Sequence, residues 1–425
     1  MTEFSRDLAL LLTMAAIFGL INHKFLKLHR TIGLVIIAMF SSFAILALDA
    51  LFPSFNIGKQ FRSELIELDF ADVLMHGMLS FLLFAGALHV DLSRLAERKW
   101  VIGVMATFGV VASTFLIGFA MWLVFSAVGV AIPLIYCLIF GALISPTDPV
   151  AVLGILKSAH APPSLEAKIA GESLFNDGVG VVVFLILVGI AVGSPGGETL
   201  DAGGVALLFA KEAIGGVVLG LVGGGLAFYA LKSVDEYNLE VIITLALVTG
   251  LYEIAQLLHS SGPIAVVVAG LLIGNHGKRL AMSDSTREHL SNFWTLIDEI
   301  LNAVLFLLIG LEVLLISMER GFLIAAMIAI PIILLSRFIC VGIPISLFRL
   351  RDTFSPGAVR ILTWGGLRGG ISVALALSLP AGPEKPVLLT VCYVVVIFSI
   401  VVQGLTVGSL VKRLIPQDRA DNNSQ

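Results

Sequence analysis

Apolar runs of membrane-spanning length follow one another along almost the whole chain. A bilayer core about 30 Å thick is crossed by about 20 apolar residues in an α-helix, and lipid offers the backbone no hydrogen-bond partner. Charged residues make up only 13% of the chain, against about 25% in soluble domains. We therefore expect an all-α polytopic membrane protein, surrounded by membrane lipid and without a nucleic-acid partner. The runs lie at about 8–22, 32–51, 72–90, 100–129, 131–157, 168–193, 204–232, 239–258, 262–275, 293–318, 321–348, 356–380 and 387–411.

The basic residues are distributed in a way that fits about 13 transmembrane helices. With the N-terminus outside, 18 Lys and Arg residues fall on cytoplasmic segments and 6 on outer segments. Short cytoplasmic loops of membrane proteins carry such an excess. The sequence therefore predicts an outside N-terminus and a cytoplasmic C-terminus.

The fifth and twelfth runs are both interrupted. Thirteen helices divide into six, one linker and six, so the second set is inverted relative to the first, as in many secondary transporters. Residues 145–149 contain two prolines and residues 365–370 contain four glycines, and both breaks free backbone groups that must find other partners. Six-helix inverted repeats with broken crossing helices in matching places predict an ion site near the middle of the membrane.

The sixth run begins with the polar segment Gly171–Gly178. Ser173 and Asp177 share one face of a helix, while Glu172 and Asn176 share a second face about 100° away. A carboxylate in so apolar a segment is costly and is a functional candidate. We expect one face to form a small cation site and the other to form a structural ion pair. The competing interpretation is a solvated loop just outside the membrane.

Asp177 is the residue that we expect to exchange ions, because one carboxylate holds either a proton or a cation. At the break in the fifth run, Thr147 offers a hydroxyl and a freed carbonyl, and Asp148 offers a second carboxylate. The alternative role for Asp148 is a helix cap at the proline break. Since Asn176 is neutral, the Asn176–Asp177 pair has one titrating carboxylate, which suits one-for-one, electroneutral exchange.

Two arginines lie inside apolar runs and need partners there. We expect Arg337 to pair with Glu172, which makes that pair a structural ion pair and not a transport site. Arg368 lies between two pairs of glycines at the second break. We expect it to neutralise helix C-terminal carbonyls and Asp148 where the broken helices meet.

The other acids within apolar runs have less defined roles. Asp298 and Glu299 fit the edge of an amphipathic helix, Glu312 is expected to reach water at the outer surface, and the role of Glu253 stays open. The three cysteines have neither ligand spacing nor a paired pattern, so we expect buried thiols and no resident metal or other cofactor.

These motifs together resemble the monovalent cation:proton antiporter-1 family, the NhaP/NHE-type sodium–proton exchangers. The resemblance covers essentially the whole membrane region. Its matching segments are Gly141–Val152, Gly171–Asp177, Ser261–Val268, Phe306–Gly310, Ser336–Arg337 and Gly365–Gly370.

The resemblance implies a homodimer in which a mobile core carries the ion site past a fixed panel in an elevator-like movement. It implies panel helices at residues 1–99 and 239–320, core helices at 100–193 and 321–411, a linker helix at 194–238 and a short cytoplasmic tail at 412–425. It implies a sodium site built by Asp177, Asp148, Ser173 and Thr147. Asn176 and Arg368 would support this site, and Glu172 would pair with Arg337.

The family pattern is not matched everywhere. Many relatives have an alanine–glutamate pair near the end of the eighth helix, where this chain reads Tyr252-Glu253-Ile254-Ala255 and the acid is displaced by about one helical turn. The Asn176–Asp177 pair, in place of two aspartates, resembles the electroneutral branch.

The sequence thus predicts a Na⁺/H⁺ antiporter for pH and sodium homeostasis in a bacterial inner membrane, and not an enzyme. The main alternative is K⁺/H⁺ or broad monovalent cation/H⁺ exchange, because oxygen ligands of the same kind bind Na⁺, Li⁺ and K⁺. A cation channel is a more remote alternative, which would need a continuous pore. An intramembrane aspartyl protease using Asp148 and Asp177 is disfavoured, because neither aspartate follows a Gly-Xaa-Gly motif.

Overall fold

The computed structural model of the chain is helical throughout the residues that it describes. These residues are 3–52, 73–93, 99–149, 152–154, 156, 163–192, 202–277, 282–316, 319–349 and 357–414. Within them, β-type pairing is limited to a single isolated bridge. The expected cytoplasmic tail lies outside the described residues from 415 onward.

Eight helices in the described ranges are long and apolar enough to cross a membrane. They comprise Leu8–Leu26 (α1, Glu3–Ile21, and η1, Asn22–Leu26), Arg30–Leu51 (α2), Lys99–Ala127 (α7, Lys99–Ala106, and α8, Phe108–Ala127), Lys168–Val192 (in α11, Pro163–Val192), Ala210–Lys232 (in α12, Ala202–Lys232), Tyr237–Leu257 (α13), Arg320–Phe348 (α17) and Glu384–Leu414 (α20, Glu384–Phe398; η6, Ser399–Gln403; α21, Gly404–Leu414). The predicted all-helical membrane fold is therefore confirmed.

The remaining helices are shorter or more polar. They are η3 (Val73–Met78), α5 (Leu79–Leu88), α9 (Leu134–Ile144), α14 (Gly262–Leu272), η4 (Ile273–Gly277), α16 (Asp284–Leu311), η5 (Glu312–Leu315), α18 (Ala358–Trp364) and α19 (Gly370–Leu377). The long helix α16 carries a charged face, and the twelfth apolar run is divided between α18 and α19. The number of 13 spans therefore stays a prediction.

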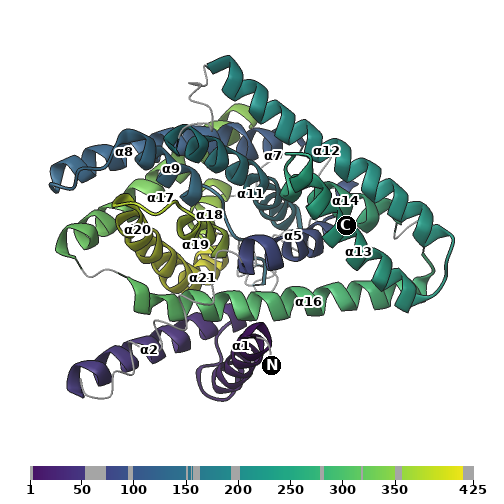
Figure 1. Cartoon of the computed structure of the whole chain (residues 1–425), viewed down its shortest axis with the longest axis horizontal. Helices are drawn as coiled ribbons and strands as arrows, with labels where there is room; N and C mark the ends of the chain where they lie inside the picture. The colour runs from purple at the N-terminus through teal and green to yellow at the C-terminus, as the bar shows by residue number, and fades with distance from the viewer. Residues whose placement is uncertain are drawn as a thin grey trace.

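The helix α16 separates two groups of helices (Figure 1). On one side it packs along α2 and contacts α1, and on the other it contacts α5, α13 and α19. The helices α12, α13 and α14 pack against one another at the end where α16 begins. The helices α8, α9, α17 and α20 pack together near the other end, around a continuous apolar core.

Both predicted helix breaks are present, and they lie against each other. The helix α9 ends at Ile144, just before the two prolines, which cannot supply backbone donors. The twelfth run is interrupted between Trp364 and Gly370. The backbone N–H of Asp148 donates to the carbonyl of Leu367 at 2.8 Å, in an antiparallel bridge. The two unwound segments thus satisfy part of each other's free backbone groups, as apolar surroundings require.

Candidate functional site

The polar segment of α11 faces the first break from inside the protein. Its four polar side chains are all buried. Glu172, Ser173 and Asn176 are each at most 2% exposed, and Asp177 is 7% exposed. Thr147, at the break itself, is 4% exposed. The segment is therefore interior, and the interpretation as a solvated loop is wrong.

Asn176 and Ser173 bind Thr147 through both its backbone and its hydroxyl. The amide of Asn176 donates to Thr147 Oγ1 at 2.9 Å and accepts from the Thr147 backbone N–H at 3.3 Å. The Ser173 hydroxyl donates to the Thr147 carbonyl and lies 3.1 Å from Thr147 Oγ1. These bonds satisfy the backbone groups freed by Pro146 and gather several oxygen atoms around one residue.

Asp148 and Asp177 lie near this cluster, close enough for their charges to interact. Both line a cavity of about 720 Å³, together with Thr147. Asp148 comes from the break after α9 and is half-buried, whereas Asp177 comes from α11. Two carboxylates, one from the break after α9 and one from α11, thus line the same cavity as Thr147.

The same cavity extends from the crossing towards the ends of several other helices. Its polar lining includes His29, Arg30, His89, Asp91, Glu166, Thr295, Asp298, Glu299 and Asn302. These residues come from the start of α2, the end of α5, the start of α11 and the middle of α16. Such a lining offers water and small ions a polar approach to Asp148 and Asp177.

Asp298 is a further candidate at this cavity. It is half-buried, as the expected edge of an amphipathic helix allows, and it lines the cavity wall together with Asp148. Glu299 also fits its expected position, because it is exposed and forms an ion pair with Arg30 at 2.5 Å. The amphipathic pattern predicted the polar face of α16, but it could not predict that this face lines an internal cavity.

Glu312 is also placed differently from the expectation that it reaches water. It is 1% exposed, and its neighbours include Tyr393 of α20. The reason is that the short helix η5 continues directly from α16 and packs against α2, which keeps this carboxyl away from the surface. Glu253 lies on α13 and is exposed.

His29 lies where the cavity meets the turn between η1 and α2. Its Nδ1 is 3.0 Å from Thr31 Oγ1, and its Nε2 is pressed against Gly154, where an added Cβ would be 2.3 Å away. Burial, together with the positive charge of Arg30, lowers the pKa of His29 from 6.5. At neutral pH the imidazole is therefore uncharged, and the neighbouring Arg30 contributes positive charge to the cavity lining.

Arg368 lies in the second break and joins it to the first. It is 2% exposed, and its guanidinium donates to the carbonyl of Pro146 at 2.8 Å and to that of Ser145. Its backbone N–H donates to Ser399 Oγ at 2.9 Å. A cation on carbonyls at the C-terminal end of α9 offsets the negative end of the helix dipole, which is the expected role at these carbonyls; the expected neutralisation of Asp148 stays a prediction.

Glu172 and Arg337 form the ion pair that the sequence suggested. Arg337 Nη2 donates to Glu172 Oε2 at 2.8 Å, and Nη1 donates to Oε1. The pair joins α11 to the middle of α17, and both side chains are at most 9% exposed. Glu172 thus pairs with α17, whereas Asn176, which helical spacing grouped with Glu172, instead binds Thr147 together with Ser173.

Two discontinuous helices cross at a cluster of oxygen ligands and two acids, beside a cavity. This arrangement is typical of secondary transporters, in which unwound backbone and carboxylates hold the transported cation. A family model described as "Sodium/hydrogen exchanger, transmembrane" matches residues 11–413. The chain therefore belongs to the sodium/hydrogen exchanger family of multi-pass membrane transporters.

Individual relatives agree with this assignment. The chain is 49% identical to the Na⁺/H⁺ antiporter NhaP of Pseudomonas aeruginosa over 412 residues, which cover 96% of each chain. It is 39% identical over 326 residues to the Na⁺/H⁺ antiporter NhaH of Halobacillus dabanensis, covering 75% of this chain and 77% of that protein. The structure of the sodium proton antiporter MjNhaP1 from Methanocaldococcus jannaschii has the same fold, with a TM-score of 0.73, 19% identity and coverage of 98% of this chain and 100% of that chain.

Proposed function

We propose that the protein exchanges Na⁺ for H⁺ across a bacterial inner membrane, one for one, in pH and sodium homeostasis. The observation that carries the proposal is the position of Asp177, a buried carboxylate in a cavity beside Asp148 and the Thr147–Ser173 oxygens. The relatives that cover nearly the whole chain are Na⁺/H⁺ antiporters by name, which supports the same choice of ions.

In this proposal Asp177 carries either a proton or Na⁺, and never both. Proton binding neutralises the carboxylate, so it removes the charge that a cation needs in an apolar interior. Asp148, Ser173 and Thr147 supply further oxygen ligands, which suit a hard cation that has lost its water. Asn176 shapes the site by holding Thr147 but adds no charge, which supports electroneutral exchange.

The domain plan of the sequence analysis is part of the proposal. A panel at residues 1–99 and 239–320 would form the homodimer, and a core at 100–193 and 321–411 would move past it, with inverted six-helix repeats and an outside N-terminus. The two broken helices both belong to this core and hold each other at Asp148 and Leu367. The contact between His29 of the panel and Gly154 of the core would then have to open during the movement.

Proton flux into liposomes of the purified protein tests the proposal. Under an imposed pH gradient, adding Na⁺ is expected to trigger proton movement, with the same rate when valinomycin and K⁺ clamp the voltage. Li⁺ and K⁺ are compared in turn, and a response to K⁺ alone would replace sodium by potassium as the transported ion. Cation flux that needs no proton gradient and no counter-ion would contradict antiport and favour a channel.

Gly369→Ala is expected to slow exchange by more than about tenfold, which corresponds to about 1.4 kcal/mol. An added Cβ at this position would lie 2.2 Å from Asp148 Oδ2, so the carboxylate must move away from its place at the crossing. The rate of Na⁺-triggered proton flux measures this effect. Gly189→Ala in α11 is the matched control, because nothing lies within 4 Å of its added Cβ; equal rates in the two variants would contradict the prediction.

A further inference from the structure

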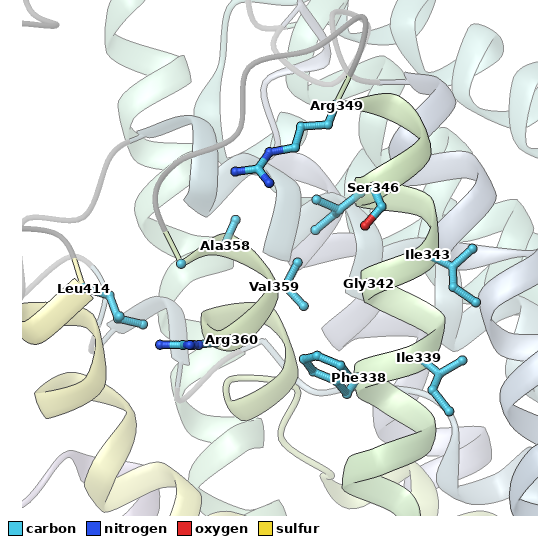
Figure 2. A pocket seen from close by; sticks show the side chains of 12 residues that line it. Phe338, Ile339, Gly342, Ile343, Ser346, Arg349, Ala358, Val359, Arg360 and Leu414 are labelled. Carbon is cyan, nitrogen blue, oxygen red and sulfur yellow. The ribbon is translucent and has the colours of Figure 1, made fainter.

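A second cavity of about 620 Å³ lies beside the C-terminal turns of α17, from Phe338 to the end of the helix (Figure 2). It is a groove between the last three turns of α17, the start of α18 and Leu414 at the end of α21. Its volume is in the range of about 300–1,000 Å³ that is usual for ligand pockets. The cation site and its cavity do not include any of these residues.

The groove begins at a membrane surface and runs inward. The helix α17 has 29 residues, so it is about 43 Å long and exceeds the bilayer core of about 30 Å. Arg349 follows its last turn, and Phe338 lies about 16 Å deeper at 1.5 Å per residue. Figure 2 shows Arg349 at one end of the groove and Phe338 towards the other, with Val359 between α18 and α17. The groove thus spans about one leaflet.

The lining combines an apolar slot with two arginines, Arg349 at the surface end and Arg360 on α18 at about the level of Phe338 in Figure 2. Phe338 is 50% exposed and Ile343 is 56% exposed, as side chains that face lipid can be. Arg349 and Arg360 are both exposed, and no acid is among the described residues that line the groove. In the described part of the chain, neither guanidinium has a carboxylate partner. Lys412 and Arg413 add positive charge on the last turn of α21.

We propose that this groove binds an anionic phospholipid. Its phosphate would lie between Arg349 and Arg360, since guanidinium groups bind phosphate oxygens with two parallel hydrogen bonds. One acyl chain would follow the apolar lining down to Phe338. Basic pockets between transmembrane helices at the membrane surface bind anionic headgroups in this way. The site lies outside the ion-exchange site and does not depend on which cation is exchanged.

The bound lipid would brace two helices that position the crossing. Phe338 follows Arg337, the partner of Glu172, and α18 leads directly into the break at residues 365–370. Within the groove the two helices approach closely at Gly342, where an added Cβ would be 3.7 Å from Val359. A lipid that binds only the folded protein raises its stability by mass action. Anionic lipid is therefore expected to stabilise the core.

Thermal unfolding of the full chain in detergent tests the proposal. Phosphatidylglycerol is expected to raise the Tm by about 3 °C more than phosphatidylcholine with the same acyl chains. The double change Arg349→Gln with Arg360→Gln is expected to remove at least half of this difference. Arg320→Gln makes the same change at the opposite end of α17 and is the control. This variant is expected to keep the full difference in Tm between the two lipids. Native mass spectrometry of the same samples counts the bound lipids.

Four results would overturn the proposal. Equal shifts with both lipids would show that the groove does not select a headgroup, and an equal shift with inorganic phosphate alone would show a free-anion site. If Arg320→Gln also lost the Tm difference between phosphatidylglycerol and phosphatidylcholine, the effect would be one of general charge and not of the groove. Should the double variant fail to fold, Ser346→Trp tests the same site, because it fills the groove and keeps both arginines. This variant is expected to lose the phosphatidylglycerol adduct, and its retention would contradict the proposal.

Discussion

Asp177→Asn is expected to abolish Na⁺-triggered proton movement while the protein still folds. The asparagine has nearly the same shape, so the packing around a side chain that is 7% exposed should persist. It retains one acceptor oxygen, but it can neither take up a proton nor neutralise a cation. Exchange requires the side chain at position 177 to hold a proton and a cation in turn. The exchange rate should therefore fall by at least about 100-fold, or about 2.7 kcal/mol.

The measurement compares wild type and variant in the same liposome assay, with Tm in detergent as the test of folding. Glu253→Gln is the matched control, because it also removes one acid from a membrane helix but changes an exposed residue outside the cavity. The control is expected to exchange at the wild-type rate. Full activity of Asp177→Asn would remove Asp177 from the exchange site and reopen the channel interpretation.

The helix breaks could be predicted because they depend on backbone chemistry that the sequence states directly. Proline removes a donor and glycine removes the side chain, so the clusters at residues 145–149 and 365–370 favour a break, although α17 accommodates the single prolines Pro331 and Pro344. Helical periodicity grouped Ser173 with Asp177 and Glu172 with Asn176, but Asn176 binds Thr147 beside Ser173 and only Glu172 binds Arg337. The pairing of Arg337 with an acid followed from the cost of an unpaired charge in an apolar interior.

The surroundings of acids on α16 could not be predicted in the same way. The periodic pattern of this helix places Asp298 on a polar face, but a polar face can meet water, a headgroup or an internal cavity. Which of these it meets depends on helices distant in sequence, here the break after α9 and the start of α2. Glu312 was misplaced for the same reason, since its burial results from the packing of η5 against α2.

Removing either partner of the Glu172–Arg337 pair is expected to lower stability more than it changes ion preference. Glu172→Ala leaves a buried guanidinium without its counter-charge, and Arg337→Ala leaves a buried carboxylate. Breaking such a pair costs about 3–5 kcal/mol, which should lower the Tm in detergent by several degrees. The Na⁺ concentration for half-maximal exchange should change little in whatever protein folds, because Ser173 and Asp177 bear no bond to the pair and Thr147 lies in the break after α9.

The double variant with both alanines separates the ion pair from simple loss of packing. Its loss of stability should be smaller than the sum of the two single losses, because neither charge is then left buried alone. The pair is connected to the crossing on both sides: α11 carries both Glu172 and Asp177, and an added Cβ on Gly366 in the second break would lie 2.7 Å from Arg337 Nε. The pair therefore fixes α11 and α17 beside the crossing, and unchanged Tm values in the single variants would show that the crossing is held without it.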